Sequence, residues 1–207
     1  MARFVSSTFG KISGKHGTAV AAVRKDGLCI LKEYRIASNP NTPGQKNQRG
    51  KFGFVMKELN CLRRVFTQTY DGQYGINKAV ALTMKTAVSG EFPDFKLDYS
   101  KLPISVGNLY CTSVVKAEKI NAYTLKISWN TEFTVYGSAT DKVNLVFLNK
   151  KSKYVIEKNE CSVRANGSVE IELPGSWAGN EIHVWIYFRS LNGNRYSSSC
   201  YIGLFQL

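Results

Sequence analysis

The chain has 207 residues, of which 43% are hydrophobic and 21% charged and only five are proline, so its composition excludes a disordered tail and leaves room for one large or two small domains. Its formal net charge of +13 favours acidic or phosphate-rich partners. The excess lies toward the amino terminus, because residues 1–75 hold 13 Lys and Arg against 4 Asp and Glu.

Targeting and cofactor signals are weak in this chain. Residues 1–17 contain no apolar stretch long enough for a signal peptide, and no window approaches the roughly 18 apolar residues of a membrane span. The five cysteines are widely spaced and never form CxxC, which favours buried free thiols over a zinc site or a disulfide framework. We therefore expect a protein that is cytoplasmic when made and binds no metal or other cofactor.

The first predicted element is a β-hairpin. Strand-prone runs near residues 17–24 and 28–36 flank Lys25-Asp26-Gly27, and Asp-Gly favours a tight turn because both residues tolerate positive φ. Before the hairpin, the segment FGKISGKHGT lacks the GxxxxGK[ST] spacing of a phosphate-binding loop. We interpret it as a flexible or closely packed lead-in.

A long amphipathic helix is predicted from Pro43 to about Thr69. Pro40 ends the preceding strand, Thr42 can serve as N-cap, and Gln45 completes a capping box. Apolar residues then recur at steps of three and four, at Phe52, Val55, Met56, Leu59, Leu62, Val65 and Phe66.

A second helix is predicted from about Ile76 to Val88, after a break at residues 71–75 and before a stop at Gly90. The segment EFPDFKLDYSKLP reads as a connector that contains a short strand. We place a domain boundary near residue 100, with a basic hairpin-plus-helices module over residues 1–100.

Residues 101–207 are predicted to form an all-β sandwich of the immunoglobulin or fibronectin type III kind, so the chain as a whole belongs to the α+β class. About seven strand-like segments follow Ile104, separated by Asn, Gly and Ser turns. Trp129 and Trp185 are candidate core residues. In IHVWIYF, residues 182–188, apolar side chains alternate with His183, Trp185 and Tyr187, and only one of the two sets is expected to face the core.

Catalytic chemistry finds little support in the sequence. His16 lies in a glycine-rich loop and His183 in a strand, without the spacing of a metal or nucleophile site. Glu170 and Glu172 share one face of a strand, which solvent exposure explains. We expect the protein not to be an enzyme.

The basic amino-terminal region is the candidate functional site. Its residues could contact nucleic-acid phosphates, line a protein assembly surface, or form a solvated face. The candidates are Lys11, Lys15, Arg24, Lys46, Gln48, Arg49, Lys51, Lys57, Arg63 and Arg64.

The segments FGKISGKHGTAVAA and YRIASNPNTPGQKNQRGKF carry a resemblance. They resemble the amino-terminal signature of an uncharacterised Bacteroidetes family of similar length, and similar NPxTxxQxxQRxxF segments occur in hypothetical phage and prophage proteins. The resemblance is specific over residues 9–59 and only topological over residues 104–207. It implies a shape and a context, and no known activity. The matching positions are Gly14, Gly17, Gly27, Arg35, Asn39, Pro40, Thr42, Gln45, Gln48, Arg49 and Phe52.

Two hypotheses about function follow. The leading one is a non-enzymatic structural or assembly protein of phage or prophage type, a virion or assembly component that binds other protein subunits or further copies of itself. The alternative is a nucleic-acid-binding protein that uses the basic hairpin and helix.

Overall fold

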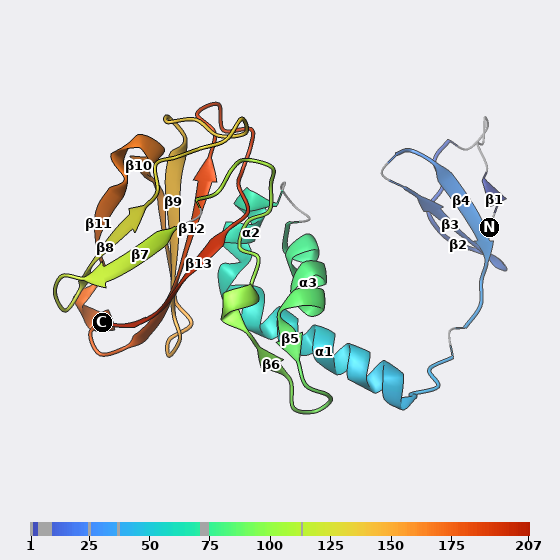
Figure 1. Ribbon diagram of the computed structural model, residues 1–207. Helices are drawn as coiled ribbons and strands as arrows, with labels where there is room; N and C mark the ends of the chain where they lie inside the picture. The colour runs from blue at the N-terminus through green and yellow to red at the C-terminus, as the bar shows by residue number, and fades with distance from the viewer. Residues whose placement is uncertain (1, 4–9, 25, 37, 71–74, 113) are drawn as a thin grey trace. The chain divides into compact units, whose positions relative to one another are not determined.

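A computed structural model describes residues 2–3, 10–24, 26–36, 38–70, 75–112 and 114–207 of the chain. The chain forms two compact units, Met1–Thr42 and Pro43–Leu207 (Figure 1). Each unit has its own secondary structure and its own buried residues.

The first unit is a four-stranded antiparallel sheet with the strand order β1-β4-β3-β2. Its strands are β1 (Ala2–Arg3), β2 (Gly14–His16), β3 (Ala19–Val23) and β4 (Cys29–Glu33). Strands β3 and β4 confirm the predicted hairpin, and the chain turns at Gly27, whose φ of 79° costs glycine little. The glycine-spaced segment, predicted as a lead-in, instead contributes the edge strand β2.

The helices of the second unit begin at Pro43, as predicted, because the backbone N–H that proline lacks is not needed at the first position of a helix. The predicted single helix is divided into α1 (Pro43–Leu59), the 3₁₀ turn η1 (Asn60–Leu62) and α2 (Arg63–Thr69). A three-residue spacing explains the division, since Leu59, Leu62 and Val65 are all fully buried. A 3₁₀ turn has three residues per turn and therefore places them on one side.

The second predicted helix is α3 (Gly75–Thr86), which ends before the predicted Val88. Val88 instead opens the strand β5 (Val88–Ser89), which pairs with β6 (Lys96–Leu97) and confirms the short strand in the connector. Residues 71–74 of the predicted break lie outside the described part of the chain.

Two helical glycines allow neighbouring segments to pack closely, the β5–β6 connector at Gly50 and α2 at Gly75. A side chain at Gly50 of α1 would lie 2.5 Å from the ring of Phe92, and one at Gly75 of α3 would overlap the carbonyl group of Phe66 in α2. Glycine costs a helix interior roughly 1 kcal/mol relative to alanine. At these two positions the close approach accounts for its presence.

Seven antiparallel strands form the predicted immunoglobulin-like β-sandwich. One sheet has the order β10-β9-β12-β13 and the other the order β11-β8-β7. The strands are β7 (Val115–Lys119), β8 (Thr124–Trp129), β9 (Lys142–Asn149), β10 (Val155–Val163), β11 (Ser168–Glu172), β12 (Glu181–Arg189) and β13 (Cys200–Gln206). Three 3₁₀ turns accompany them, η3 (Tyr99–Lys101), η4 (Arg164–Asn166) and η5 (Gly175–Trp177).

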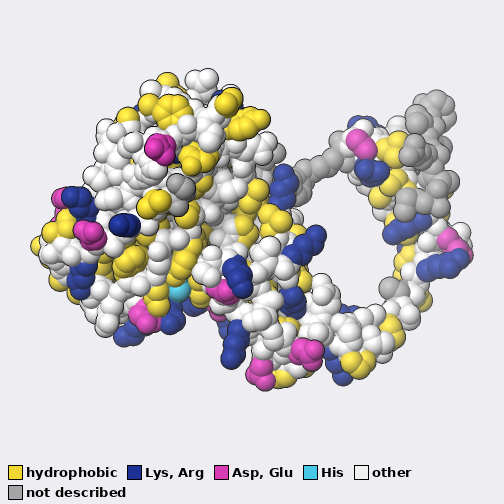
Figure 2. All heavy atoms as spheres, viewed as in Figure 1, with side chains coloured by type: hydrophobic (Ala, Val, Ile, Leu, Met, Phe, Trp, Pro, Cys, Tyr) yellow, Lys and Arg dark blue, Asp and Glu magenta, His cyan; other side chains and the backbone are white. Residues whose placement is uncertain are grey.

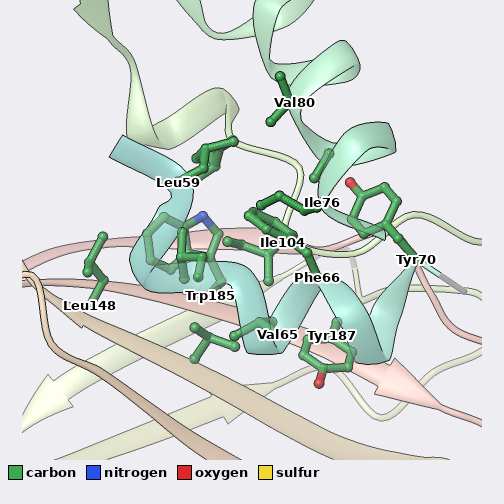
Figure 3. Close-up of a cluster of buried hydrophobic side chains, with 14 of the residues drawn as sticks. Leu59, Val65, Phe66, Tyr70, Ile76, Val80, Ile104, Leu148, Trp185 and Tyr187 are labelled. Carbon is green, nitrogen blue, oxygen red and sulfur yellow. The ribbon is translucent and has the colours of Figure 1, made fainter. Parts of the chain in front are cut away.

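Both faces of β12 are buried, which differs from the expectation that only one set of its side chains faces a core. Ile182, Val184, Ile186 and Phe188 lie between the two sheets together with Trp129. Trp185 and Tyr187 point to the opposite side, where the helices cover the four-stranded sheet (Figure 3). Both candidate core tryptophans are thus buried, but in different clusters.

The helices and the sandwich share one of these cores. Leu59, Phe66 and Ile76 of the helices pack in the same cluster as Leu148 and Trp185 of the sheet (Figure 3). The division between compact units therefore falls at residue 42, whereas the sequence placed a boundary near residue 100.

Two further findings concern membrane spans and cysteines. Within the described ranges, no helix is both long and apolar enough to cross a membrane. All five cysteines are free thiols, but only Cys29 is buried and the other four are half-buried. The expectation of buried thiols therefore holds for Cys29 alone.

Candidate functional site

The predicted basic residues are divided between the two units. Lys11, Lys15 and Arg24 lie in the first unit and are exposed. Arg24 pairs with Asp26 at 3.4 Å, so part of its charge is compensated within the turn of the hairpin.

The other seven candidates lie on α1 and α2, namely Lys46, Gln48, Arg49, Lys51, Lys57, Arg63 and Arg64. Gln48 and Arg49 are exposed, and half of the Phe52 side chain is exposed one turn later. Spacings of three and four residues place these three on one stripe of the helix. Arg64 lies 3.7 Å from Glu157 of β10, which ties α2 to the sandwich.

One face of the first sheet combines basic and aromatic side chains. Val20 of β3 lies opposite both Lys15 of β2 and Lys32 of β4. Ile30 and Tyr34 share this face because alternate residues of a strand point the same way. The ammonium group of Lys15 lies 3.9 Å from the ring centroid of Tyr34, so the face presents cations beside an aromatic ring.

Exposed apolar side chains gather at one end of the sandwich (Figure 2). We call this set the loop-end surface; it lies where β8 and β12 end and where β7, β9 and β13 begin. Its members are Val106, Val114, Phe133, Val135, Tyr136 and Leu191. Val135 is 97% exposed, so almost its whole apolar side chain lies in solvent.

The loop between β8 and β9 supplies half of this surface and is internally bonded. The N–H of Gly137 donates to the carbonyl oxygen of Thr134 at 2.9 Å. The carboxylate of Asp141 accepts from the N–H of Ser138 at 2.8 Å. The loop therefore holds its apolar side chains outward on a closed backbone turn.

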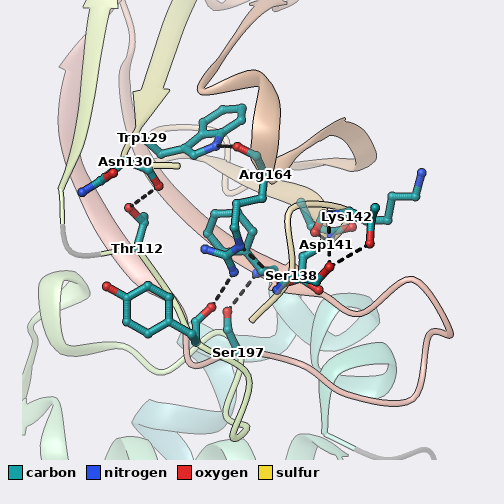
Figure 4. Close-up of polar contacts among 12 residues, drawn as sticks. Thr112, Trp129, Asn130, Ser138, Asp141, Lys142, Arg164 and Ser197 are labelled. Atoms are coloured by element: carbon teal, nitrogen blue, oxygen red, sulfur yellow. Dashed lines mark hydrogen bonds and ion pairs between the residues drawn. The ribbon is translucent and has the colours of Figure 1, made fainter. Parts of the chain in front are cut away.

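Arg164 in η4 ties this loop to its neighbours (Figure 4). Its side chain is fully buried, donates to Asp141 at 3.3 Å and to the carbonyl oxygen of Tyr110 at 2.6 Å, and lies 3.7 Å over the ring of Phe188. Burial lowers the pKa of Arg164, and the charge of Asp141 acts against that shift. The indole N–H of Trp129 donates to the backbone carbonyl oxygen of Arg164 at 2.8 Å, so both the side chain and the backbone of Arg164 bind neighbouring segments.

A cleft of about 860 Å³ adjoins the loop-end surface. It lies between α2 and α3 on one side and residues 106–108 and 193–196 on the other, with Lys78 and Arg195 as exposed cations in its lining. Backbone N–H groups of Leu109 and Tyr110 donate to Tyr196 and Tyr136 at 3.1 Å, so the segment that lines the cleft also supports the β8–β9 loop. The cleft and the surface can therefore contact one partner together.

A second ionisable cluster joins the helices to the sheet. The ammonium group of Lys153 lies 2.5 Å from the carboxylate of Glu58 and donates to the hydroxyl of Tyr99 at 2.7 Å. The Tyr99 hydroxyl in turn donates to Glu58 at 2.9 Å. Burial raises the pKa of Glu58, but its bonds to Lys153 and Tyr99 outweigh burial and lower it overall. The three polar groups hydrogen-bond to one another, which indicates a structural role in linking the helices to the sheet.

His183 lies next to the cluster of Glu58, Tyr99 and Lys153. Its ring stacks on Tyr99 with centroids 4.2 Å apart, and its Nδ1 lies 2.8 Å from the hydroxyl of Tyr201. Burial lowers the pKa of His183 to about 4, so the ring is neutral near pH 7. Among the described residues, no group of three or more His, Cys, Asp or Glu is arranged to hold a metal ion.

The sequence analysis missed the loop-end surface. The signal was present in TEFTVYG, residues 131–137, an aromatic stretch between two predicted strands. Sequence periodicity treats apolar and aromatic residues as core candidates, and only the exposure of Phe133, Val135 and Tyr136 in the folded loop shows that they point outward.

Comparisons with known proteins identify the chain only at the level of a family. Among curated proteins, none matches it. Among solved structures, it is similar to the chicken CNTN1 FN1-FN3 domains, with 10% identity and a TM-score of 0.32 over 57% of this chain and 39% of that one. The model of a family of unknown function, DUF6266, matches residues 11–203, and the chain therefore belongs to that family.

Proposed function

We propose that this protein is a non-enzymatic assembly protein that binds other protein subunits through its loop-end surface. The observation that carries the proposal is the set of six exposed apolar side chains at one end of the sandwich, supported from beneath by the buried pair of Arg164 and Asp141. Contiguous exposed apolar side chains favour protein contacts, because covering them removes apolar area from water.

Preorganisation supports the same proposal. The β8–β9 loop is closed by its own backbone bonds and by Asp141, so little conformational entropy is lost when a partner covers it. Phe133 and Tyr136 are the aromatic types that often anchor interfaces. A phage or prophage assembly is the context we propose, on the strength of the amino-terminal resemblance.

A photo-crosslinking residue at position 135, in the full chain in its native cells, tests this proposal. We expect crosslinks from position 135 to one defined protein, or to a second copy of the chain, and loss of that complex in a Val135→Ser, Tyr136→Ser variant. Ile120, which is half exposed in the turn between β7 and β8, is the matched control site. Strictly monomeric light scattering together with no crosslink from position 135 would reject the proposal. A crosslinked protein from virions would support the phage context, and one without any phage neighbour in the genome would remove it.

A second candidate function is nucleic-acid binding by the basic residues of the hairpin and of α1. The face formed by Lys15, Lys32 and Tyr34 favours it, because cations beside an exposed ring suit phosphates and unstacked bases. The binding constant should then fall with salt, with a log–log slope of about 0.9 per phosphate neutralised on duplex DNA.

Charge-reversal variants distinguish this candidate from general basic attraction. Lys15→Glu with Lys32→Glu should weaken oligonucleotide binding and reduce the salt slope, as should Glu at Lys46, Arg49, Lys51 and Lys57. Lys116→Glu, an exposed position of β7, makes the same charge change in the sandwich and should leave binding nearly unaltered. Equal losses in all the variants, or unchanged DNA retention, would exclude a dedicated face.

A further inference from the structure

The cleft beside the loop-end surface is preformed by hydrogen bonds between its walls. The Thr69 hydroxyl at the end of α2 donates to the carbonyl oxygen of Ile104 at 2.9 Å, and the N–H of Leu109 donates to that of Tyr196 at 3.1 Å. The segment from Ile104 to Leu109 is therefore tied to a helix at one end and to the loop between β12 and β13 at the other. A cleft with fixed walls loses little conformational entropy when a ligand fills it.

The loop between β12 and β13 holds Arg195 at this cleft. The N–H of Gly193 donates to the carbonyl oxygen of Ser190 at 2.8 Å, and the N–H of Ser190 donates to that of Arg195 at 2.9 Å. The guanidinium group of Arg189 also donates to the carbonyl oxygen of Gly193 at 3.3 Å. These bonds fix the backbone of the loop, and Arg195 is exposed in the lining of the cleft.

The charges in this lining have one sign. Lys78 of α3 and Arg195 are both exposed there, and neither side chain has a hydrogen-bond or ion-pair partner among the residues that the structure describes. Of the described residues that line the cleft, none is an aspartate or a glutamate. Two cations without a compensating carboxylate attract an anionic group.

The lining is also apolar in part. Ala81 and Leu82 share one stripe of α3 with Lys78, because they follow it by three and four residues. Val106 belongs both to the cleft and to the loop-end surface. A nucleic-acid backbone would meet the cations and leave these apolar side chains uncovered, whereas a peptide with acidic and apolar side chains covers both.

We propose that the cleft binds a short acidic and apolar segment of the partner protein that covers the loop-end surface. The inference rests on the proposed function and adds the chemistry of the partner to it. The volume of about 860 Å³ lies within the range of roughly 300–1,000 Å³ that holds small ligands, which leaves room for a short extended peptide. A second copy of the chain fits less well, because its net charge of +13 opposes its approach to a basic cleft.

Selection from a random peptide library on the immobilised full chain tests this inference. We expect the enriched peptides to combine Asp or Glu with aliphatic or aromatic residues. Lys78→Gln with Arg195→Gln should weaken the binding of a selected peptide roughly tenfold, because two exposed charge pairs are lost. Ala81→Trp should block binding, since position 81 is exposed in the cleft and the larger side chain fills it.

A matched variant separates the cleft from the general charge of the chain. Lys116→Gln with Lys151→Gln removes the same charge at exposed positions outside the cleft lining and should change the affinity less than roughly twofold. Circular dichroism checks that each variant keeps its fold. Failure to enrich any peptide, enrichment of peptides without acidic residues, or equal losses in the matched variant would overturn the inference. A single-stranded oligonucleotide whose binding Ala81→Trp abolishes would assign the cleft to nucleic acid and overturn it as well.

Photo-crosslinking from positions 81 and 135 in native cells separates this inference from the proposed function. A position-81 crosslink to an Asp- and Glu-rich segment of the protein that position 135 captures would support both. Capture from position 135 alone would overturn the cleft inference and leave the proposed function in place. No crosslink from either position would reject the proposed function and, with it, the partner segment assigned to the cleft.

Discussion

Arg164 shows how a single buried charge organises several loops. Its guanidinium group bonds to Asp141 and to the carbonyl oxygen of Tyr110, and it lies over the ring of Phe188. A charge removed from water is tolerated only where its partners compensate for lost hydration. The sequence could not predict this pair, because 22 residues separate Asp141 from Arg164 and both types usually lie at the surface.

Replacement of Arg164 should strongly destabilise the second unit. We expect Arg164→Met to lower the free energy of unfolding by about 3–5 kcal/mol, because it leaves the Asp141 carboxylate buried without its partner. Urea denaturation measures the change. Arg195→Met, at an exposed arginine of the same end, is the control, and a similarly small effect of both changes would contradict the assigned role.

His183 should make stability depend on pH. Its pKa is about 4 in the folded chain and about 6.5 when unfolded, so between these values the unfolded chain binds a proton that the folded chain does not. Stability should therefore fall as pH drops from about 6.5 toward 4 and should be level above that range. The lowered pKa of Glu58 adds a loss only below its ordinary value of 4.5.

Urea midpoints measured between about pH 5 and 6.5 isolate the histidine from Glu58. Tyr99, Tyr201 and Trp185 surround the ring, and Lys150 and Lys153 are the nearby cations that favour its neutral form. The slope should become shallower in His183→Phe. An unchanged slope in this variant would assign the pH dependence to other groups.

At the level of elements, local signals predicted most of the strands and helix starts. Asp26-Gly27 marked the hairpin and Pro43 marked the start of α1, because both depend on the backbone of one or two residues. The division of the helix at Asn60–Leu62 and the exposure of loop 131–137 depend on contacts with residues distant in sequence. Neither could therefore be predicted from the neighbouring residues alone. The same limit applies to the predicted basic residues. Their charge can be read from the sequence, but which of them share an exposed surface depends on how α1 and the first sheet fold.

Two helical glycines should respond to alanine in opposite directions. Gly75→Ala should destabilise by about 1–3 kcal/mol, because the new methyl group would overlap the backbone of Phe66 in α2. Gly53→Ala in α1 meets no atom within 4 Å and should stabilise by about 0.5–1 kcal/mol through helix propensity. Thermal unfolding of both variants checks the pair, and changes of equal sign would contradict the packing of α3 on α2.

For the whole molecule, the shared core makes the helices part of the sandwich's folding unit. One face of the sheet β10-β9-β12-β13 is covered by the helices and is fully or almost fully buried at Val146, Leu148, Trp185 and Tyr187. The predicted boundary near residue 100 followed the change from helical to strand-like pattern, which does not reveal which faces are covered.

Two truncated chains test this shared core. Residues 43–207 should unfold cooperatively with a midpoint close to that of the full chain, because the first unit contributes little to the core. Residues 101–207 should aggregate, since the face that contains Trp185 would be exposed. Circular dichroism and light scattering report the two outcomes, and a soluble, folded chain of residues 101–207 would show that the helices are dispensable.

The burial of both faces of β12 also bears on how the chain can vary through evolution. Strands at the surface of a sandwich tolerate polar replacements at every second position, whereas all residues from Ile182 to Phe188 are buried. A saturation mutagenesis library should therefore show no alternating tolerance along this strand. Relatives of this chain should diversify in the loops at the sandwich end and keep a continuous apolar and aromatic stretch along β12.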